Sequence, residues 1–203
     1  MTEWHFYEPS QGHRLPHDPL NAIVAPRPIG WISTVSAAGR RNLAPYSFFN
    51  LLNYRPPLIA FSSMGWKDSV ANAEATGEFV WNLATRPLAE AMNATSAQTD
   101  ADEFELAGLE ATPSRLVAPP RVAASPVAFE CKLTQLIRLT TREGRELDQW
   151  LVIGEAVGIH IDAALLEDGV YQTARARPIS RGGGPADYFE TTEDALFRMR
   201  RPD

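Results

Sequence analysis

The chain has 203 residues, of which 44% are hydrophobic and 22% charged, enough to bury a core in one ordinary domain. Its net charge of −6 and isoelectric point near 5.3 argue against a surface for nucleic acid or an anionic membrane. Cys131 is the only cysteine, which excludes an internal disulfide and a cysteine-rich metal site. The first residues carry no basic and apolar signal pattern, and no apolar run approaches the roughly 20 residues of a membrane helix. We therefore expect a single domain over residues 1–203, located in the cytoplasm.

The first third of the chain predicts a surface segment followed by strands. Residues 1–20 are rich in Pro, His and polar side chains, and we expect them to wrap the surface. Residues 47–54 either continue a strand or bend into a turn. β-Branched and aromatic residues predict a strand over 29–36, and a turn signal at 38–40 predicts a hairpin with a second strand over 42–46. A short apolar run over 58–63 is typical of a buried strand.

The middle of the chain predicts two helices around one strand. A helix over 68–76 has Asp68 available as N-cap and Gly77 as its end. Alternation over 78–84 predicts a strand with Phe79, Trp81 and Leu83 on one face. A helix with Pro87 in its first turn follows, and one stripe of it carries Leu88, Ala91, Met92 and Thr95.

The last part predicts a covering segment, a long hairpin and a tail. Residues 98–126 are acidic and Pro-rich, and we expect them to cover the sheet. A turn at 141–145 joins two long strands, and a tail over 189–203 includes a short amphipathic helix over 191–199. In the first long strand, Val127, Phe129, Cys131 and Leu133 are expected to point inward and Ala128, Glu130, Lys132 and Thr134 outward. In the return strand, Leu151, Ile153, Val157, Ile159 and Ile161 are expected to line one face. Repeated strands with hairpin turns indicate a mostly antiparallel β domain.

The segment from Ser62 to Asn72 is the strongest candidate site. A buried strand ends in two serines, passes a glycine and enters a helix with Lys67 and Ser69 at its start. Free N–H groups and the positive end of a helix dipole suit a phosphate, and Lys67 would add charge. The same residues also fit an ordinary capped helix with a solvated lysine. The spacing is not that of a Walker P-loop.

Taken together, several motifs resemble the flavin reductase-like family. They are Arg27 to Thr34, Gly39, Asn42 to Asn50, Pro56-Pro57, Lys67-Asp68-Ser69 with Asn72, and Gly77-Glu78-Phe79, with weaker similarity at Gly154 to Ile161 and at Ser180 to Gly184 with Tyr188. Residues 1–20 and 98–126 match poorly. The resemblance implies a mainly β fold, a six-stranded antiparallel Greek-key split barrel with flanking helices, that binds FMN as a homodimer.

The resemblance also implies which side chains hold the cofactor. Thr34, Asn42, Ser47 and Phe48 would face the isoalloxazine and ribityl chain. Ser62, Lys67 and Ser69 would hold the phosphate, with Asn72 supporting them. The pocket would be closed by His160 and Tyr188, often from the partner subunit. The aromatic residues Trp31, Tyr46, Phe48, Phe49 and Trp66 could shelter the ring, or each could be core.

The other candidate functional residues are weaker. His160 on a strand is more often a structural histidine than a catalyst, and Cys131 is expected to be an inert buried thiol. Pro16 between His13 and His17 argues against a metal pair, and we expect no metal and no catalytic residue beyond the cofactor. The arginines Arg175, Arg177 and Arg181 either form salt bridges or meet a phosphate.

The predicted function is that of an NAD(P)H:FMN oxidoreductase, which passes a hydride from NADH or NADPH to FMN and electrons on to flavin, oxygen or a partner such as a monooxygenase. The alternatives are a flavin-holding electron carrier, a flavin-binding module without nicotinamide turnover, and an enzyme resembling pyridoxamine-phosphate oxidase. NADH and NADPH are not distinguished, because no G-x-G-x-x-G pattern is present.

Overall fold

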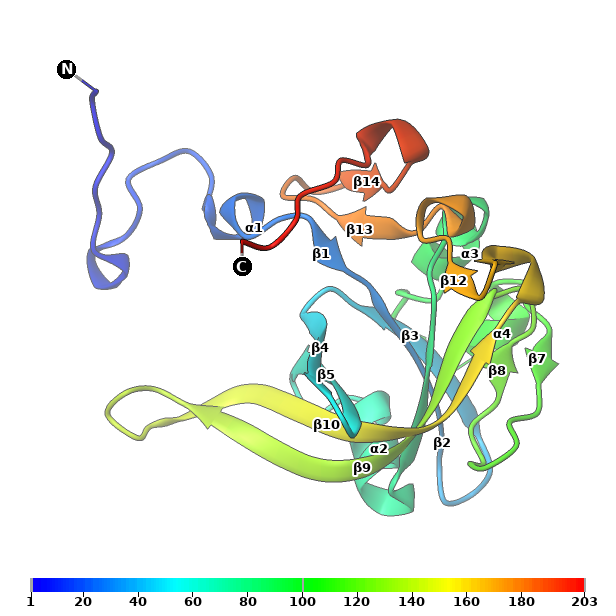
Figure 1. The fold of residues 1–203 in the computed structure, drawn as a ribbon. Helices are drawn as coiled ribbons and strands as arrows, with labels where there is room; N and C mark the ends of the chain where they lie inside the picture. Colours follow the sequence, from blue (N-terminus) through cyan, green and yellow to red (C-terminus); the bar gives the residue numbers. More distant parts are fainter. Residues whose placement is uncertain (1, 100, 203) are drawn as a thin grey trace.

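The computed structural model describes residues 2–99 and 101–202, so Met1, Asp100 and Asp203 lie outside the described part. Seven antiparallel strands form the main sheet, in the order β3-β2-β6-β9-β10-β5-β4 (Figure 1). These strands are β2 (Gly30–Val35), β3 (Arg41–Tyr46), β4 (Phe49–Tyr54), β5 (Pro57–Met64), β6 (Glu78–Asn82), β9 (Val127–Thr140) and β10 (Glu146–Ile161).

Smaller sheets and short helices surround the main sheet. The sheets pair β1 (Arg27–Pro28) with β13 (Ile179–Arg181) and β14 (Tyr188–Glu190), β7 (Ala111–Thr112) with β8 (Arg121–Val122), and β11 (Leu166–Glu167) with β12 (Val170–Tyr171). The helices are α1 (Leu20–Ile23), α2 (Asp68–Thr76), α3 (Ala89–Ala94) and α4 (Glu103–Leu106), with 3₁₀ turns at Pro9–Gln11, Arg86–Leu88, Ala163–Leu165, Ala174–Ala176 and Glu193–Ala195. None of the helices in the described part is both long and apolar enough to cross a lipid bilayer.

The mainly β class with flanking helices is confirmed, but the main sheet has seven strands rather than six. The chain bends at Ser47 and Phe48, and residues 49–54 then pair with β5 as a separate edge strand. The predicted strands over 29–36, 42–46 and 58–63 form with small shifts at their ends. Gly39, with a φ of 83°, makes the tight turn that joins β2 to β3.

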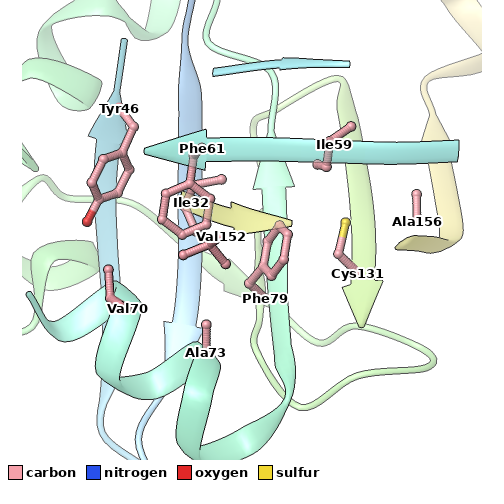
Figure 2. Close-up of a cluster of buried hydrophobic side chains, with 10 residues drawn as sticks. All are labelled: Ile32, Tyr46, Ile59, Phe61, Val70, Ala73, Phe79, Cys131, Val152 and Ala156. Atoms are coloured by element: carbon pink, nitrogen blue, oxygen red, sulfur yellow. The ribbon is translucent and has the colours of Figure 1, made fainter. Parts of the chain in front are cut away.

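The main core lies between the curved sheet and α2, which contacts β2, β3, β6, β9 and β10. Figure 2 shows side chains from these elements and from β5 meeting in one cluster. Phe61 and Phe79 pack edge to face, with ring centroids 5.6 Å apart. The cluster comprises Ile32, Tyr46, Ile59, Phe61, Val70, Ala73, Phe79, Cys131, Val152 and Ala156. Cys131 is therefore a buried core thiol, as expected, and burial raises the pKa of its thiol.

A second core lies on the other face of β2 and β3. Trp31 is fully buried there, and its indole N–H donates to Thr95 Oγ1 at 3.0 Å. The segment over 98–126 contributes Phe104 and Val122 to this core, so its described residues cover the sheet as predicted. Trp31 is consequently a core residue and lies too deep to shelter a ligand.

Three predicted element boundaries were wrong. The N-cap of α2 is Lys67, while Asp68 occupies the first turn and no side chain caps the helix. The strand β6 ends at Asn82, before Leu83. Residues 191–199 form only the 3₁₀ turn Glu193–Ala195, and the apolar side chains after it are exposed, with no neighbouring element to bury them. Gly77 ends α2 in the left-handed conformation, as predicted.

The long hairpin also departs from simple alternation. Ala128 and Glu130 were predicted to point outward, but both are buried because the segment over 98–126 covers that face. In β10, Ala156 and Gly158 pair with adjacent residues of β9, so the extra residue Val157 reverses the alternation beyond it. The five apolar residues expected along one face of this strand therefore do not share it.

In Figure 1 the C-terminal tail runs past the small sheet of β1, β13 and β14 to the neighbourhood of α1. Residues 2–18 extend away from the main sheet in Figure 1, and none of them is buried. The predicted wrapping of residues 1–20 over the surface is therefore not seen within a single chain. The long β9–β10 hairpin projects toward the same side of the view as the N-terminal segment, below it (Figure 1).

Candidate functional site

A cavity of about 420 Å³, which we call the α2 cavity, opens beside the first turn of α2. Its walls come from β3, the start of α2, the segment after α3 and the first residue of α4. The lining residues are Asn42, Ala44, Pro45, Tyr46, Lys67, Asp68, Ser69, Thr95 to Thr99 and Glu103. This volume lies within the range of ordinary ligand pockets.

Local sequence explains how the cavity forms. Alternation along β3 places Asn42, Ala44 and Tyr46 on the side that faces α2. Gly65 has a φ of 82°, which lets the chain turn between β5 and α2. No side chain within the described residues caps α2, so the N–H groups of Asp68 and Ser69 stay available for an anion, while the Val70 N–H donates to the Lys67 carbonyl at 2.9 Å.

Four of the predicted site residues form one buried polar cluster behind this cavity. The Asn42 amide donates to Ser69 Oγ at 2.8 Å and to Thr34 Oγ1 at 3.3 Å. The Asn72 amide donates to the same Thr34 oxygen at 3.0 Å. Thr34 is 0% exposed, so it supports the wall and does not itself face the cavity.

Tyr46 brings an unpaired hydroxyl to the cavity wall. The residue is 8% exposed, and within the described residues its buried Oη makes no hydrogen bond of good geometry, although the Ser69 and Ser63 hydroxyls lie nearby. Burial raises the pKa of Tyr46, and those two hydroxyls oppose the shift. Figure 2 shows the hydroxyl at the edge of the core, on the side of Val70 in α2. A buried polar group without a partner is costly, so this hydroxyl is poised to receive one.

Glu103 adds a buried carboxyl to the same wall. It is 7% exposed, and its Oε2 accepts the N–H of Leu43 at 3.1 Å. Burial raises its pKa, against the effect of the backbone donors, so the carboxyl has an increased tendency to be neutral. At the rim, Arg40 pairs with Asp68 at 3.3 Å and offsets its charge. Lys67 beside them is exposed.

A second cavity of about 590 Å³, which we call the Tyr188 cavity, adjoins the first. The two share Pro45 and Ser96. Three predicted site residues, Ser47, Arg181 and Tyr188, line it. The six predicted residues that line a cavity are thus divided between two neighbouring cavities, with Asn42, Lys67 and Ser69 in the first.

Comparison with known proteins shows the family of this chain. A family model described as a flavin reductase like domain matches residues 24–180. The chain belongs to the flavin reductase-like family. It is 36% identical over 170 residues to an uncharacterized protein of Aquifex aeolicus, covering 80% of this chain and 83% of that one.

Similar solved structures support the same family assignment. Component B of nitrilotriacetate monooxygenase from Bacillus cereus matches with a TM-score of 0.82 and 32% identity, over 89% of this chain and 90% of that one. The 2-nitrobenzoate 2-nitroreductase of Pseudomonas fluorescens matches with a TM-score of 0.79 and 30% identity, over 90% and 88%. The predicted split barrel is confirmed.

Five predicted cofactor-site residues line neither cavity of this flavin reductase-like chain. Thr34 and Asn72 lie in the polar cluster behind the α2 cavity, and the other three lie elsewhere. Ser62 Oγ accepts from the Gln149 amide at 2.6 Å. Phe48 is 48% exposed, with the Arg27 guanidinium 5.8 Å from its ring centroid. His160 is engaged elsewhere: its Nε2 lies 2.5 Å from Glu130 Oε1, on the face covered by the segment over 98–126.

The C-terminal arginines are held by local partners. Arg175 pairs with Glu167 at 2.6 Å, and Arg177 pairs with Glu190 at 2.5 Å. Arg181 donates to two backbone carbonyls of the loop before β14 and stacks on Tyr188, 4.9 Å from the ring centroid. Within one chain, Arg175 and Arg177 therefore fit the salt-bridge interpretation, whereas Arg181 is held by backbone carbonyls at the wall of the Tyr188 cavity.

Sequence reasoning missed the polar role of Tyr46 and missed Glu103 altogether. Tyr46 follows Asn42 at an even spacing on the same strand, a signal that could have placed its hydroxyl beside the predicted site. Glu103 sits in an acidic segment without apolar periodicity, so nothing local indicated that it would be buried against β3.

Proposed function

We propose that this chain binds FMN with the phosphate at the first turn of α2, and that it is an NAD(P)H-dependent FMN reductase. The observation that carries the proposal is the α2 cavity, where an uncapped helix N-terminus, Lys67 and the unpaired hydroxyl of Tyr46 converge. These are three kinds of donor for one anion.

The residues present fit such a ligand. Lys67 and the first-turn N–H groups would hold the phosphate, with the Ser69 and Tyr46 hydroxyls as further donors. The fixed amides of Asn42 and Asn72 keep Ser69 in place from behind. The raised pKa of Glu103 reduces the negative charge that a phosphate would meet in the same cavity.

The chemistry that FMN supplies is the acceptance of a hydride from NADH or NADPH and the delivery of electrons to an acceptor. The chain's own residues would bind FMN and orient it. The adjoining Tyr188 cavity supplies space beside the α2 cavity, with Ser47 and Tyr188 on its wall. No side chain needs to act as an acid or base in this proposal.

The electron acceptor is proposed from the relatives. One similar structure is component B of nitrilotriacetate monooxygenase and another is a 2-nitrobenzoate 2-nitroreductase. We propose that free flavin, passed on to a monooxygenase partner, is the acceptor, with a nitroaromatic compound as the alternative.

We also propose that the chain acts as a homodimer in the cytoplasm. Apolar side chains are exposed on the edge strand β4 and along β10, and exposed apolar groups of this kind mark interaction surfaces. They include Leu51 (51% exposed), Leu52 (53%), Ile159 (50%) and Ile161 (42%). Sedimentation analysis should give twice the mass of the chain, and Leu52→Asp should favour the monomer.

The first experiment asks whether the protein is yellow as isolated and measures FMN binding by calorimetry. Lys67→Ala combined with Ser69→Ala should weaken FMN binding by about 2–4 kcal/mol, because charge-assisted hydrogen bonds to phosphate are lost. Lys132, the only other lysine, is exposed on β9, so Lys132→Ala is the matched control. Unchanged FMN affinity in the double variant would place the phosphate elsewhere.

A second experiment separates the functions. Steady-state oxidation of NADH and NADPH with added FMN should proceed if the chain is a reductase. FMN binding without nicotinamide oxidation would instead indicate an electron carrier or a flavin store. Formation of pyridoxal phosphate from its amine precursor would support the oxidase alternative.

A further inference from the structure

The β9–β10 hairpin projects beyond the main sheet (Figure 1), and its base lies against the segment that joins β5 to α2. We call residues 138–150 the arm and residues 62–67 the phosphate segment. No residue of the arm lines either cavity, and the proposed function does not use the arm.

Two hydrogen bonds tie the arm to the phosphate segment. The Gln149 amide donates to Ser62 Oγ at 2.6 Å, and the Gly65 N–H donates to the Asp148 carbonyl at 3.0 Å. Gly65 is the left-handed residue that turns the chain toward α2. The arm therefore fixes the segment at its first residue and at its turn.

Stacked side chains make a third connection. The Trp66 and Trp150 rings meet edge to face, with centroids 4.5 Å apart at 77°. The Arg138 guanidinium lies 5.3 Å from the Trp150 centroid, while its Nε donates to the Leu147 carbonyl at 2.9 Å. The indole N–H of Trp150 has no hydrogen-bond partner among the described residues, so stacking is what orients this ring toward Trp66.

An irregularity in β10 makes these contacts possible. Glu146 pairs with Thr140 and Trp150 with Arg138, so three residues of β10 face a single residue of β9 between those pairs. Residues 147–149 are thereby released from pairing with β9. Bulges of this kind re-aim side chains and often lie next to active sites.

We propose that the arm positions the phosphate segment, with Trp150 and Gln149 as positioning residues for Lys67, which directly follows Trp66. The inference rests on the proposed function and assigns to that site a set of residues outside its walls. A segment held in advance loses less conformational freedom when it binds an anion, and this raises affinity for the phosphate alone.

The test compares FMN with riboflavin, which lacks the phosphate, by calorimetry on the full chain. Trp150→Ala and Gln149→Ala should each weaken FMN binding, by about tenfold and about fivefold, and change riboflavin affinity less than about twofold. Trp150→Phe should restore FMN affinity, since the ring makes no hydrogen bond through its nitrogen. Arg142 at the hairpin tip pairs only with its neighbour Glu143, so Arg142→Ala is the matched control.

The outcomes separate this inference from the proposed function. If the unaltered chain binds FMN more tightly than riboflavin and both variants keep that ratio, the arm has no positioning role and the inference is overturned. An equal loss for both ligands also overturns it, because that indicates general loosening of the fold. If Trp150→Ala does not fold, Gln149→Ala decides alone. If the unaltered chain shows no preference for FMN, the proposed phosphate site and this inference both fail.

Discussion

Two buried carboxylates in this chain have opposite environments. Glu130 is 0% exposed and accepts the N–H groups of Arg115 and Leu116 at 2.8 and 2.6 Å, together with His160 Nε2. Glu103 is almost as buried but accepts the Leu43 N–H and lines an open cavity. Burial raises the pKa of both, but at Glu130 the three donors outweigh it and the pKa is lowered.

This contrast distinguishes buried polar residues that stabilise the fold from those that are available to a ligand. Where every buried polar group has its partners, as around Glu130 and Thr34, the arrangement stabilises the fold and leaves nothing for a ligand. Where partners are missing, as at Tyr46 Oη, a ligand can provide them. Substitutions on each side of that division test it.

The largest effect is expected from Glu130→Ala. It leaves two backbone N–H groups and a histidine without their acceptor in a covered region, so we expect a loss of about 3 kcal/mol in the free energy of unfolding. Urea denaturation measures it. Glu130→Gln keeps an acceptor oxygen and should lose less. Glu146 forms an exposed ion pair with Arg138, so Glu146→Ala is the comparison. A loss for Glu130→Ala no larger than for Glu146→Ala would show that Glu130 does not stabilise the fold as proposed.

The same residue predicts a pH dependence. The pKa of Glu130 is lower in the folded chain than its ordinary value of 4.5, so its contribution to stability is present above about pH 4.5. That contribution is lost as the pH falls through the folded-state pKa. Unfolding free energies measured between pH 7 and 3 should therefore fall more steeply for the unaltered chain than for Glu130→Gln.

Tyr46→Phe should separate ligand binding from folding. The hydroxyl has no partner of good geometry within the described residues, so its removal should leave the free energy of unfolding unchanged or raise it slightly. If the hydroxyl donates to the phosphate of FMN, affinity should fall by about 2 kcal/mol, roughly thirtyfold. Calorimetry with FMN and urea denaturation without it give the two numbers. A loss of stability with unchanged FMN affinity would show instead that the Tyr46 hydroxyl stabilises the fold and does not bind FMN.

Thr34→Val tests the opposite case. Its Oγ1 accepts from the amides of Asn42 and Asn72, so valine should lower the free energy of unfolding by about 1.5 kcal/mol. Because Thr34 is fully buried, FMN affinity should change by less than about 0.5 kcal/mol. Unchanged stability with a marked loss of affinity would instead place Thr34 against the cofactor, as the family resemblance implied.

Much of the fold could be predicted from the sequence because its signals are local. The turn signal around Gly39 predicted β3 as a hairpin strand, a short apolar run predicted β5, and Gly77 predicted the end of α2. The outward placement of Glu130 failed because its burial depends on a covering segment from a distant part of the chain. Alternation alone cannot indicate which face of a strand a later segment will cover.

The candidate site was only partly predictable for a similar reason. The cluster around Ser69 and Lys67 could be proposed from the β5–α2 motif, since strand end, turn and helix start are contiguous. His160 could not be placed, because its partner Glu130 lies on the neighbouring strand and the bulge at Val157 sets which way its side chain points. Glu103 gave no local signal, and only the packing of α4 against β3 brings it to the cavity.

The smallest effect is expected at Glu103. Its pKa is raised above the ordinary 4.5, so its favourable contribution is present below that pH and is lost as the pH rises through the folded-state pKa. Glu103→Gln keeps an oxygen for the Leu43 N–H and removes the charge. The variant should therefore be more stable than the unaltered chain at pH 7, by about 0.5 kcal/mol, and equal to it near pH 4. FMN binding at pH 7 should tighten by about twofold, since a negative charge no longer faces the phosphate. Denaturation and calorimetry at both pH values check this, and a variant less stable at pH 7 would place Glu103 with Glu130, as a carboxylate that the fold needs in its ionised form.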